Sequence, residues 1–328
     1  MIRQLYVITT PSVDPYHNLA LEKALFASRS EDSMILYLWQ NEKTVVIGKN
    51  QNAYNECNLD TLHRDGGHLA RRLSGGGAVY HDLGNLNFTF LSPKADFNEE
   101  KENEVILNAL KHFGLPAYQN GRNDLLIDGR KFSGHAFQHS RHTSLHHGTI
   151  MLHVDAEALS RYLNVSLLKL KDKHVASVRS RVINLNDILP DLTVDACKEA
   201  LIRSAEEIYG LKAQTLREED LNPAQLEADI RLFSNDTFLY GREDHLSHGL
   251  EERFVWGTVR IEYEKENDIL TDVAVYSDAL NTEHLSSLPD LLRGKTIQEI
   301  KEVLLSSDQP EMDRDIWHLL ERGSSHAI

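Results

Sequence analysis

The segment Arg71-Arg72-Leu73-Ser74-Gly75-Gly76-Gly77-Ala78-Val79-Tyr80-His81-Asp82-Leu83-Gly84-Asn85 is the most informative part of this chain. Its three consecutive glycines lack a Cβ, so their N–H groups can close around an anion such as a phosphate. The run is not a Walker A loop, because Ala78-Val79 stands where Lys-Ser/Thr should follow, and it lacks the spacing of a dinucleotide-binding fingerprint. The alternative interpretation is a sharp turn beside two solvated arginines.

A second segment, Asn123 to Phe132, predicts a β-hairpin, because Asp128-Gly129 is a favoured type I′ turn. In this register Ile127 pairs with Arg130, Leu126 with Lys131 and Leu125 with Phe132. Side chains alternate, so one face is expected to carry Asp124, Leu126, Lys131 and Ser133, and the other Leu125, Ile127 and Phe132. The second face is apolar and should meet the core. Lys131 would then point towards a cleft beside Asp124 and Ser133, and the alternative is an edge-strand lysine in solvent.

Five histidines follow within a short stretch: His135, His139, His142, His146 and His147. Their i, i+4 spacings would suit a zinc-binding face of a helix. The residues between them carry no apolar stripe, however, and no Asp or Glu lies among them. The pattern therefore favours a polar loop over a metal site.

Hairpins and helices are mixed along the rest of the chain. Helices are expected at 15–29, 100–113, 155–163, 193–210 and 222–235, and strands at 34–39, 44–48, 86–91, 148–153, 254–264 and 269–276. We expect 34–39 and 44–48 to form one hairpin, and 254–264 and 269–276 another about Asn267-Asp268. This mixture predicts an α+β fold with much antiparallel sheet. A boundary near Leu246 would divide the chain into domains of residues 1–246 and 247–328.

Composition excludes several classes of protein. The 328 residues, 41% hydrophobic and 26% charged, are typical of a globular chain long enough for two domains. No apolar run approaches the ~18–20 residues of a membrane span, and the first residues lack the features of a secretory signal. Cys57 and Cys197 lie far apart, which indicates reduced thiols rather than a disulfide framework. We therefore expect a cytoplasmic protein with no membrane partner.

Charge is distributed unevenly. The net charge of −15 argues against a nucleic-acid partner, because affinity for the phosphate backbone comes mainly from Lys and Arg. Residues 251–328 contain 17 acidic and 8 basic residues, whereas residues 122–181 contain 5 acidic and 10 basic residues. An acidic protein with its positive charge in one segment has a place for an anion.

Several blocks together resemble the lipoate-protein ligase A family of the biotin/lipoate ligase superfamily. The segment 71–85 resembles the signature RRxSGGGAVxHDxGN, residues 121–124 resemble GRNDL, and 131–136 resemble KxSGxA. Residues 146–149 are similar to HHGT, 177–182 to SVRSRV, and 250–256 and 277–281 to the accessory domain of the longer bacterial members. The resemblance implies a biotin/lipoyl protein ligase-like catalytic domain with mixed, largely antiparallel sheets flanked by helices, plus a small α+β C-terminal domain.

The same resemblance implies a two-step reaction. Lipoate and ATP give lipoyl-AMP and pyrophosphate, and the lipoyl group then passes to a lysine of a lipoyl domain, in the E2 subunit of a 2-oxo acid dehydrogenase or in the glycine cleavage H protein. Lys131 would be catalytic, between the α-phosphate and the lipoyl carboxyl oxygen, and Asp124 would hold the Mg²⁺ that accompanies ATP. The resemblance assigns lipoate to Gly134, Ala136 and His147, and ATP or lipoyl-AMP to Arg72, Gly75, Gly76, Gly77, Ala78, Val79, Tyr80, Asn123, Asp124 and Lys131. We expect a monomer.

One departure and two alternatives remain open. His135 stands where many members have Ser, beside the expected acyl pocket, so the preference for lipoate or octanoate is open. A transferase of the same fold, thioester-type or cysteine-independent, would not use ATP; the thioester route needs an activated thiol near Lys131, and neither cysteine lies within 134–149. A non-catalytic protein that binds nucleotides or carrier domains would not need Lys131. The intact motifs favour the ligase.

Overall fold

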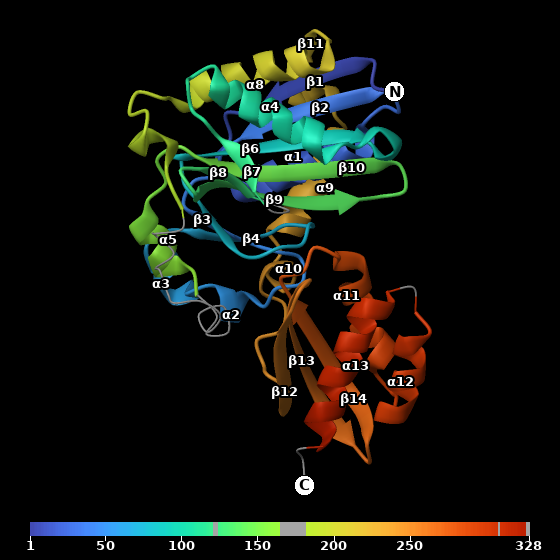
Figure 1. Cartoon of the computed structure of the whole chain (residues 1–328). Helices are drawn as coiled ribbons and strands as arrows, with labels where there is room; N and C mark the ends of the chain where they lie inside the picture. Colours follow the sequence, from blue (N-terminus) through green and yellow to red (C-terminus); the bar gives the residue numbers. More distant parts are fainter. Residues whose placement is uncertain (121–123, 165–181, 308, 326–328) are drawn as a thin grey trace.

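The computed structural model describes residues 1–120, 124–164, 182–307 and 309–325. It contains an eight-stranded sheet and two three-stranded sheets, with helices packed against them (Figure 1). The C-terminal elements, drawn in orange and red, lie below the eight-stranded sheet in this view. The expected α+β class, with mixed sheets flanked by helices and a small sheet with helices at the C-terminal end, is confirmed.

The eight-stranded sheet is the frame of the N-terminal part. Its order is β11 (Ala213–Thr215), β1 (Gln4–Thr9), β2 (Ser33–Trp39), β6 (Asn85–Pro93), β10 (Thr143–Met151), β9 (Arg130–His139), β8 (Asp124–Ile127) and β7 (Tyr118–Asn120). β1 runs parallel to β11 and β2, and the other neighbours are antiparallel. Every residue of β2 and β6 is buried, so both faces of this sheet are covered.

Each face of the main sheet packs against a pair of helices. On the α4 face, Met34, Leu36 and Leu38 pack in one core with residues of α4 (Glu99–Lys111) and α8 (Val194–Tyr209). On the α1 face, Ile35 and Tyr37 pack with residues of α1 (Pro15–Ser28) and α9 (Pro223–Phe233). Side chains of Asp14, Asn98, Thr193 and Asn222 cap the N-termini of these helices.

A small sheet of β4 (His68–Arg71), β3 (Thr44–Ile47) and β5 (Val79–His81) shares the α1-face core through Val46 and Ala70. The expected hairpin of 34–39 and 44–48 is therefore wrong, because β2 and β3 belong to different sheets. Both strands are fully buried and each needs two neighbours, which a simple hairpin does not provide. Short helices complete this part: α2 (Ala53–Glu56), α3 (Leu59–Arg64), α5 (Ala156–Tyr162), α10 (Asp236–Tyr240) and three 3₁₀ turns at Lys94–Asp96, Leu185–Asp187 and Glu218–Asp220.

The β8–β9 hairpin has the predicted turn but not the whole predicted register. Asp128 and Gly129 have φ of 50° and 73°, as a type I′ turn requires. Leu126 pairs with Lys131 as expected, but Leu125 pairs with Ser133, so Phe132 is an extra residue in a β-bulge. Leu125, Ile127 and Phe132 are fully buried as predicted. The placement of Ser133 beside Lys131 is wrong, because the bulge turns Ser133 into the core, where it is 0% exposed.

The histidine-rich segment is not a polar loop. His135 and His139 lie on β9, and His146 and His147 lie on the antiparallel strand β10. The polar residues between them misled the sequence interpretation, because these strands are covered on both faces and bury polar side chains in pairs. Among the described residues, no group of three or more His, Cys, Asp or Glu is placed to hold a metal ion.

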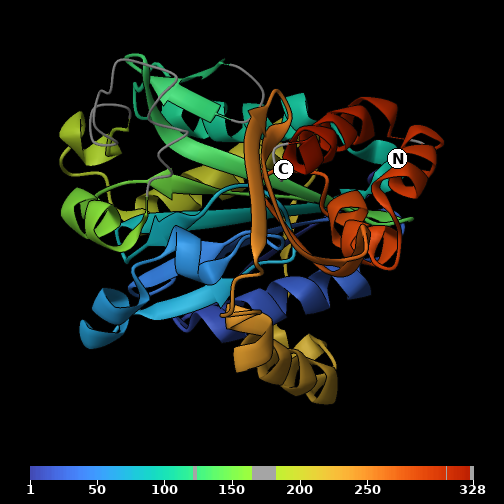
Figure 2. The same cartoon turned by 90° about the horizontal axis from the view of Figure 1, so that it is seen from below.

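The C-terminal part has its own core. β12 (His248–Phe254), β13 (Gly257–Glu266) and β14 (Ile269–Ser277) form an antiparallel sheet, with α11 (Thr282–Leu292), α12 (Ile297–Leu305) and α13 (Pro310–Ser325) packed against it. Figure 2 shows these elements in front of the other sheets. Asn267 and Asp268 have φ of 50° and 64° and form the predicted turn. None of the helices that the structure describes is both long and apolar enough to cross a membrane.

The packing of the main sheet makes a direct stability prediction. Leu36→Ala removes a fully buried side chain of the α4-face core and should lower the free energy of unfolding by about 2–5 kcal/mol. The matched control is Leu83→Ala, since Leu83 is 49% exposed and its truncation should cost less than about 0.5 kcal/mol. Urea denaturation of both variants measures the difference, and equal costs would contradict the described core.

Candidate active site

A pocket of about 190 Å³ opens between the main sheet and the glycine loop, residues 74–77, that joins β4 to β5. Its walls come from α1, β2, β3, β5, β6, β9, β10 and the glycine loop. Leu19, Trp39 and Val46 give it an apolar side, and Arg72, Lys131 and His147 give it a basic side. The pocket therefore suits an elongated apolar ligand with an anionic end.

Arg72 holds the glycine loop from beneath. Its guanidinium donates to the carbonyl oxygens of Gly75 (2.7 Å) and Gly77 (2.8 Å), to Ser74 Oγ (3.1 Å) and to the Val46 oxygen (3.1 Å). Arg72 is 6% exposed, so the alternative of a solvated arginine is wrong. Burial lowers the pKa of Arg72 to about 10, which leaves the guanidinium charged at neutral pH.

Arg71 has a different role. It is also buried, and its guanidinium donates to the carbonyl oxygens of Gln51 (2.6 Å) and Leu239 (2.8 Å). Burial lowers the pKa of Arg71 to about 10. Arg71 thus joins the small sheet to α10 and does not line the pocket, although it is adjacent to Arg72 in the sequence.

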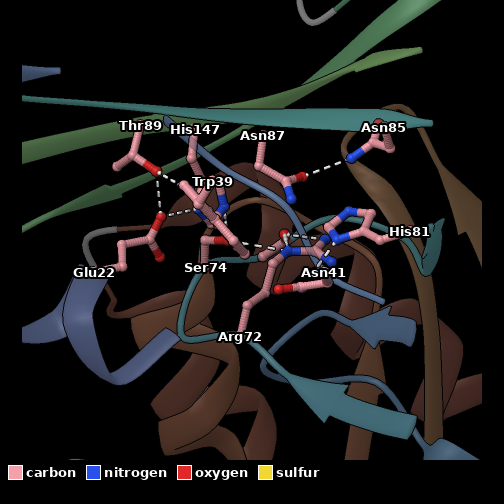
Figure 3. A network of polar contacts seen from close by, with 11 residues as sticks. Glu22, Trp39, Asn41, Arg72, Ser74, His81, Asn85, Asn87, Thr89 and His147 are labelled. Atoms are coloured by element: carbon pink, nitrogen blue, oxygen red, sulfur yellow. Dashed lines mark hydrogen bonds and ion pairs between the residues drawn. The ribbon is translucent and has the colours of Figure 1, made fainter. Parts of the chain in front are cut away.

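A buried polar network connects Arg72 to α1 (Figure 3). Glu22 Oε1 accepts a hydrogen bond from Thr89 Oγ1 (2.6 Å) and lies 2.8 Å from His147 Nδ1. His147 Nε2 lies 2.7 Å from Ser74 Oγ, so the ring connects Glu22 to the glycine loop. Sequence reasoning missed Glu22, because it lies 125 residues from His147 and belongs to a helix that carried no chemical motif.

Two buried donors face the pocket without a protein partner. Asn41 donates to His81 Nδ1 (3.2 Å), which places the ring proton on Nε2, and Asn85 donates to Asn87 Oδ1 (2.8 Å). Within the described residues, His81 Nε2 and Asn87 Nδ2 make no hydrogen bond. Burial, with Arg72 and His147 nearby, lowers the pKa of His81 to about 3, so the ring is a neutral donor. Buried donors without partners fit a ligand that brings oxygen atoms.

Lys131 lies on β9, between β8 and β10, so the edge-strand alternative is wrong. Its Nζ is 2.7 Å from Asp124 Oδ1, and the two side chains are 40% and 43% exposed. A Cβ at residue 134 would lie 2.7 Å from Lys131 Nζ, so Gly134 leaves the space that the lysine occupies. The predicted neighbourhood of Lys131 and Asp124 is thus present, with Gly134 in the place expected for Ser133.

The structure gathers most of the residues that the sequence singled out. The pocket is lined by Arg72, Gly76, Gly77, Ala78, Val79, Lys131, Gly134, Ala136 and His147. Gly75 and Tyr80 are not in its lining: Gly75 packs against Ala279 and Leu280, and the Tyr80 ring packs against Tyr162 at 5.5 Å. Asp124 is held at the rim by Lys131. Asn123, with Gly121, Arg122 and the segment 177–181, lies outside the described residues.

The two cysteine thiols do not lie at the pocket. Cys57 and Cys197 are buried and neither lines the pocket. Burial raises the pKa of each thiol to about 12, so both are protonated at neutral pH. A thiolate nucleophile is therefore not provided by either cysteine.

A glycine loop beside a narrow acyl-sized pocket, with a buried arginine and a lysine at its anionic end, is the arrangement of an acyl-activating ligase. Comparison with known families agrees: residues 14–206 match the lipoyl protein ligase A/B catalytic domain, and 245–315 match the bacterial lipoate protein ligase C-terminus. The chain belongs to the lipoate-protein ligase A family, as the sequence motifs predicted, and it is a ligase enzyme.

Individual relatives support this assignment. A lipoate-protein ligase A of Bdellovibrio bacteriovorus is 38% identical over 93% of both chains. The crystal structure of LipL1 from P. falciparum in complex with lipoate aligns with a TM-score of 0.84 at 26% identity, covering 97% of this chain and 99% of that one. A lipoate-protein ligase A bound with ATP aligns with a TM-score of 0.62 at 29% identity, over 74% of this chain and 99% of the other.

A further relative is archaeal. A bipartite lipoate protein ligase from Thermoplasma acidophilum, analysed with its E2 lipoyl domain, aligns with a TM-score of 0.63 at 32% identity. The alignment covers 74% of this chain and 99% of that chain.

The contacts of Arg72 predict an effect on nucleotide binding. Arg72→Lys removes the planar fork that binds Gly75 and Gly77 together, because a lysine presents a single ammonium. We expect the Kd for ATP to rise at least about tenfold, measured by isothermal titration calorimetry. Arg71→Lys is the matched control: it should lower Tm as Arg72→Lys does, but leave the Kd for ATP within about twofold. Equal ATP affinity in the two variants would contradict a specific role for Arg72.

Proposed function

We propose that this chain activates lipoate with ATP to give lipoyl-AMP and pyrophosphate, and then transfers the lipoyl group to a lysine of a lipoyl domain. The observation that carries the proposal is the convergence of Lys131, the Arg72-held glycine loop and two buried unpartnered donors on one pocket. Relatives of the same family bind lipoate and ATP, which agrees with this convergence.

Lipoate occupies the apolar side of the pocket in this proposal. Ala136 is a small residue that leaves room for the acyl chain, and Leu19, Trp39 and Val46 supply apolar contacts. Gly134 on β9 and His147 on the neighbouring strand β10 flank the acyl chain of lipoate. His81 Nε2 and Asn87 Nδ2 are donors that the oxygen atoms of the acid or its adenylate can satisfy. The pocket then holds both the apolar tail and the polar head.

Catalysis is electrostatic in this proposal. Attack of a carboxylate on the α-phosphate brings two anions together, and the reaction needs positive charge where they meet. Lys131 supplies an ammonium beside the α-phosphate and the carboxyl oxygen, and Arg72 fixes the loop whose residues Gly76, Gly77, Ala78 and Val79 line the nucleotide side.

Mg²⁺ is a further proposed component. Mg²⁺ in nucleotide enzymes is held by one or two carboxylates together with substrate phosphates. Asp124 fits this donor set, since its half-exposed carboxylate lies at the rim beside Lys131. Bound with ATP, the ion would neutralise phosphate charge, and Asp124 would be its protein ligand.

The remaining assignments extend the same proposal. We infer that the acceptors are lipoyl domains of E2 subunits or the H protein. We also infer that the chain acts as a monomer in the cytoplasm, where ATP is available. The catalytic domain would comprise residues 1–246 and the accessory domain residues 247–328. The start of β12 at His248 and the match of 245–315 to a separate C-terminal family support a boundary near Leu246.

The position of the thiols separates the ligase from a thioester-type transferase. The double variant Cys57→Ser/Cys197→Ser should keep ATP-dependent lipoylation within about threefold of the native rate, because both thiols are buried away from the pocket. Mass spectrometry of an acceptor domain measures the rate, with circular dichroism to confirm folding. Loss of activity in the folded variant would favour the transferase.

Lys131 is the decisive residue for the adenylation step. Lys131→Ala should lower lipoate-dependent ATP–pyrophosphate exchange by about 10²–10³-fold, the usual cost of removing a charge-stabilising donor. Lys265→Ala is the matched control, since Lys265 is also a strand lysine paired with an aspartate, Asp268, at 3.8 Å. The control should exchange at the native rate. Native exchange by Lys131→Ala would refute the assignment.

A further inference from the structure

The bulge in β9 decides which residues share a face with Lys131. In a regular strand, residues 131, 133 and 135 would lie on the same face. Because Phe132 is an extra residue, Lys131 instead shares the α1 face with Gly134 and Ala136, and Ser133 turns to the α4 face. The presence of Lys131 at the pocket therefore depends on this bulge.

A continuous chain of hydrogen bonds runs along the α4 face, behind the bulge. Glu102 Oε2 lies 2.9 Å from His146 Nδ1, and His146 Nε2 lies 3.0 Å from His135 Nδ1. His135 Nε2 lies 2.9 Å from Ser133 Oγ, and Ser92 donates to the other oxygen of Glu102 at 3.2 Å. None of these five side chains is exposed by more than 8%. The chain thus connects the residue next to the bulge with helix α4.

Aromatic rings enclose the chain. Phe88 meets the His135 ring edge-on at 5.4 Å, and Phe137 stacks on the His146 ring at 4.6 Å. In such surroundings a broken hydrogen bond leaves a polar group buried without a partner, which is more costly than at the surface. Breaking any one of these hydrogen bonds is therefore costly, and Ser133 is held in one position.

The chain of hydrogen bonds from Glu102 to Ser133 carries no net charge at neutral pH. Burial lowers the pKa of His146 to about 3 and that of His135 well below its usual value, so both rings are neutral. Burial raises the pKa of Glu102 to about 8, which favours the protonated carboxyl. The carboxyl then donates to His146 Nδ1, each ring donates from Nε2, and the last acceptor is Ser133 Oγ. Every link has one donor and one acceptor.

We propose that Glu102, His146 and His135 are positioning residues that hold the bulge through Ser133 and thereby aim Lys131 at the pocket. The inference rests on the proposed function, because it gives Lys131 the adenylation step. It extends that function to a buried layer of the protein in which only His135 also lines the pocket, whereas Glu102, His146 and Ser133 do not. It also assigns the buried histidines His135 of β9 and His146 of β10 a role other than metal binding.

Ser133→Ala in the full chain tests the proposal. We expect the single-turnover rate of lipoyl-AMP formation to fall about 10- to 100-fold, the effect of a small misplacement of a reacting group, with KM for ATP and lipoate within twofold of native. The matched control is Ser144→Ala, since Ser144 Oγ is also buried and bonded to a histidine, His139 Nδ1, at 2.8 Å. That pair lies at the far end of the β9–β10 hairpin, so the control should keep the native rate.

A double variant separates positioning from a general loss of structure. Lys131→Ala/Ser133→Ala should be no slower than Lys131→Ala alone, because Ser133 acts only through Lys131. Glu102→Gln, which can still donate to His146 Nδ1, should keep most of the rate that Glu102→Ala loses.

Two results would overturn the positioning role: a native rate in Ser133→Ala, or independent and multiplicative losses in the double variant. A native rate in Lys131→Ala would instead overturn the proposed function itself. If Ser133→Ala folds poorly, the comparison of Glu102→Gln with Glu102→Ala gives a second test.

Discussion

The burial of the Arg72 charge is the constraint on which the pocket depends. A guanidinium removed from water is tolerated only when its N–H groups are hydrogen-bonded. Here the partners are the Val46 oxygen, Ser74 Oγ and two carbonyl oxygens of the glycine loop. The loop cannot change shape without exposing part of this charge to an apolar interior. One side chain thus fixes the conformation of the segment that is proposed to hold the nucleotide.

Each face of the main sheet carries a buried chain of hydrogen bonds, and both chains include residues of β6 and β10. On the α1 face, Glu22 bonds to His147 of β10, and on the α4 face Glu102 bonds to His146 of the same strand. Adjacent residues point to opposite faces, so the two histidines serve different layers. The first chain orders the glycine loop through Ser74, and the second ends at the bulge beside Lys131. The glycine loop held by Arg72 and the bulge beside Lys131 therefore contact buried polar chains on opposite faces of one sheet.

The sequence predicted features that depend on neighbouring residues and missed those that depend on distant ones. The turn at Asp128-Gly129 and the apolar face of its hairpin follow from local alternation, and both are confirmed. The bulge at Phe132 does not follow from local alternation, because nothing in the residues of β9 announces an extra residue. Strand β12 was missed as well, since it is rich in charge and none of its residues is buried. Glu22 and Glu102 could be joined to their histidines only by the fold.

The glycine run shows why two interpretations of one motif need not exclude each other. Gly76 has a φ of 91°, which an L-residue with a side chain rarely adopts, so the run is a sharp turn. A Cβ at Gly75 would lie 2.3 Å from the Ala279 oxygen, so the run is also a contact with the C-terminal part of the chain. Gly76 and Gly77 still line the pocket, where small residues let a ligand approach the backbone. Packing excludes a side chain at residue 75 and backbone conformation disfavours one at residue 76, while a side chain at residue 77 would enter the pocket that Gly77 lines.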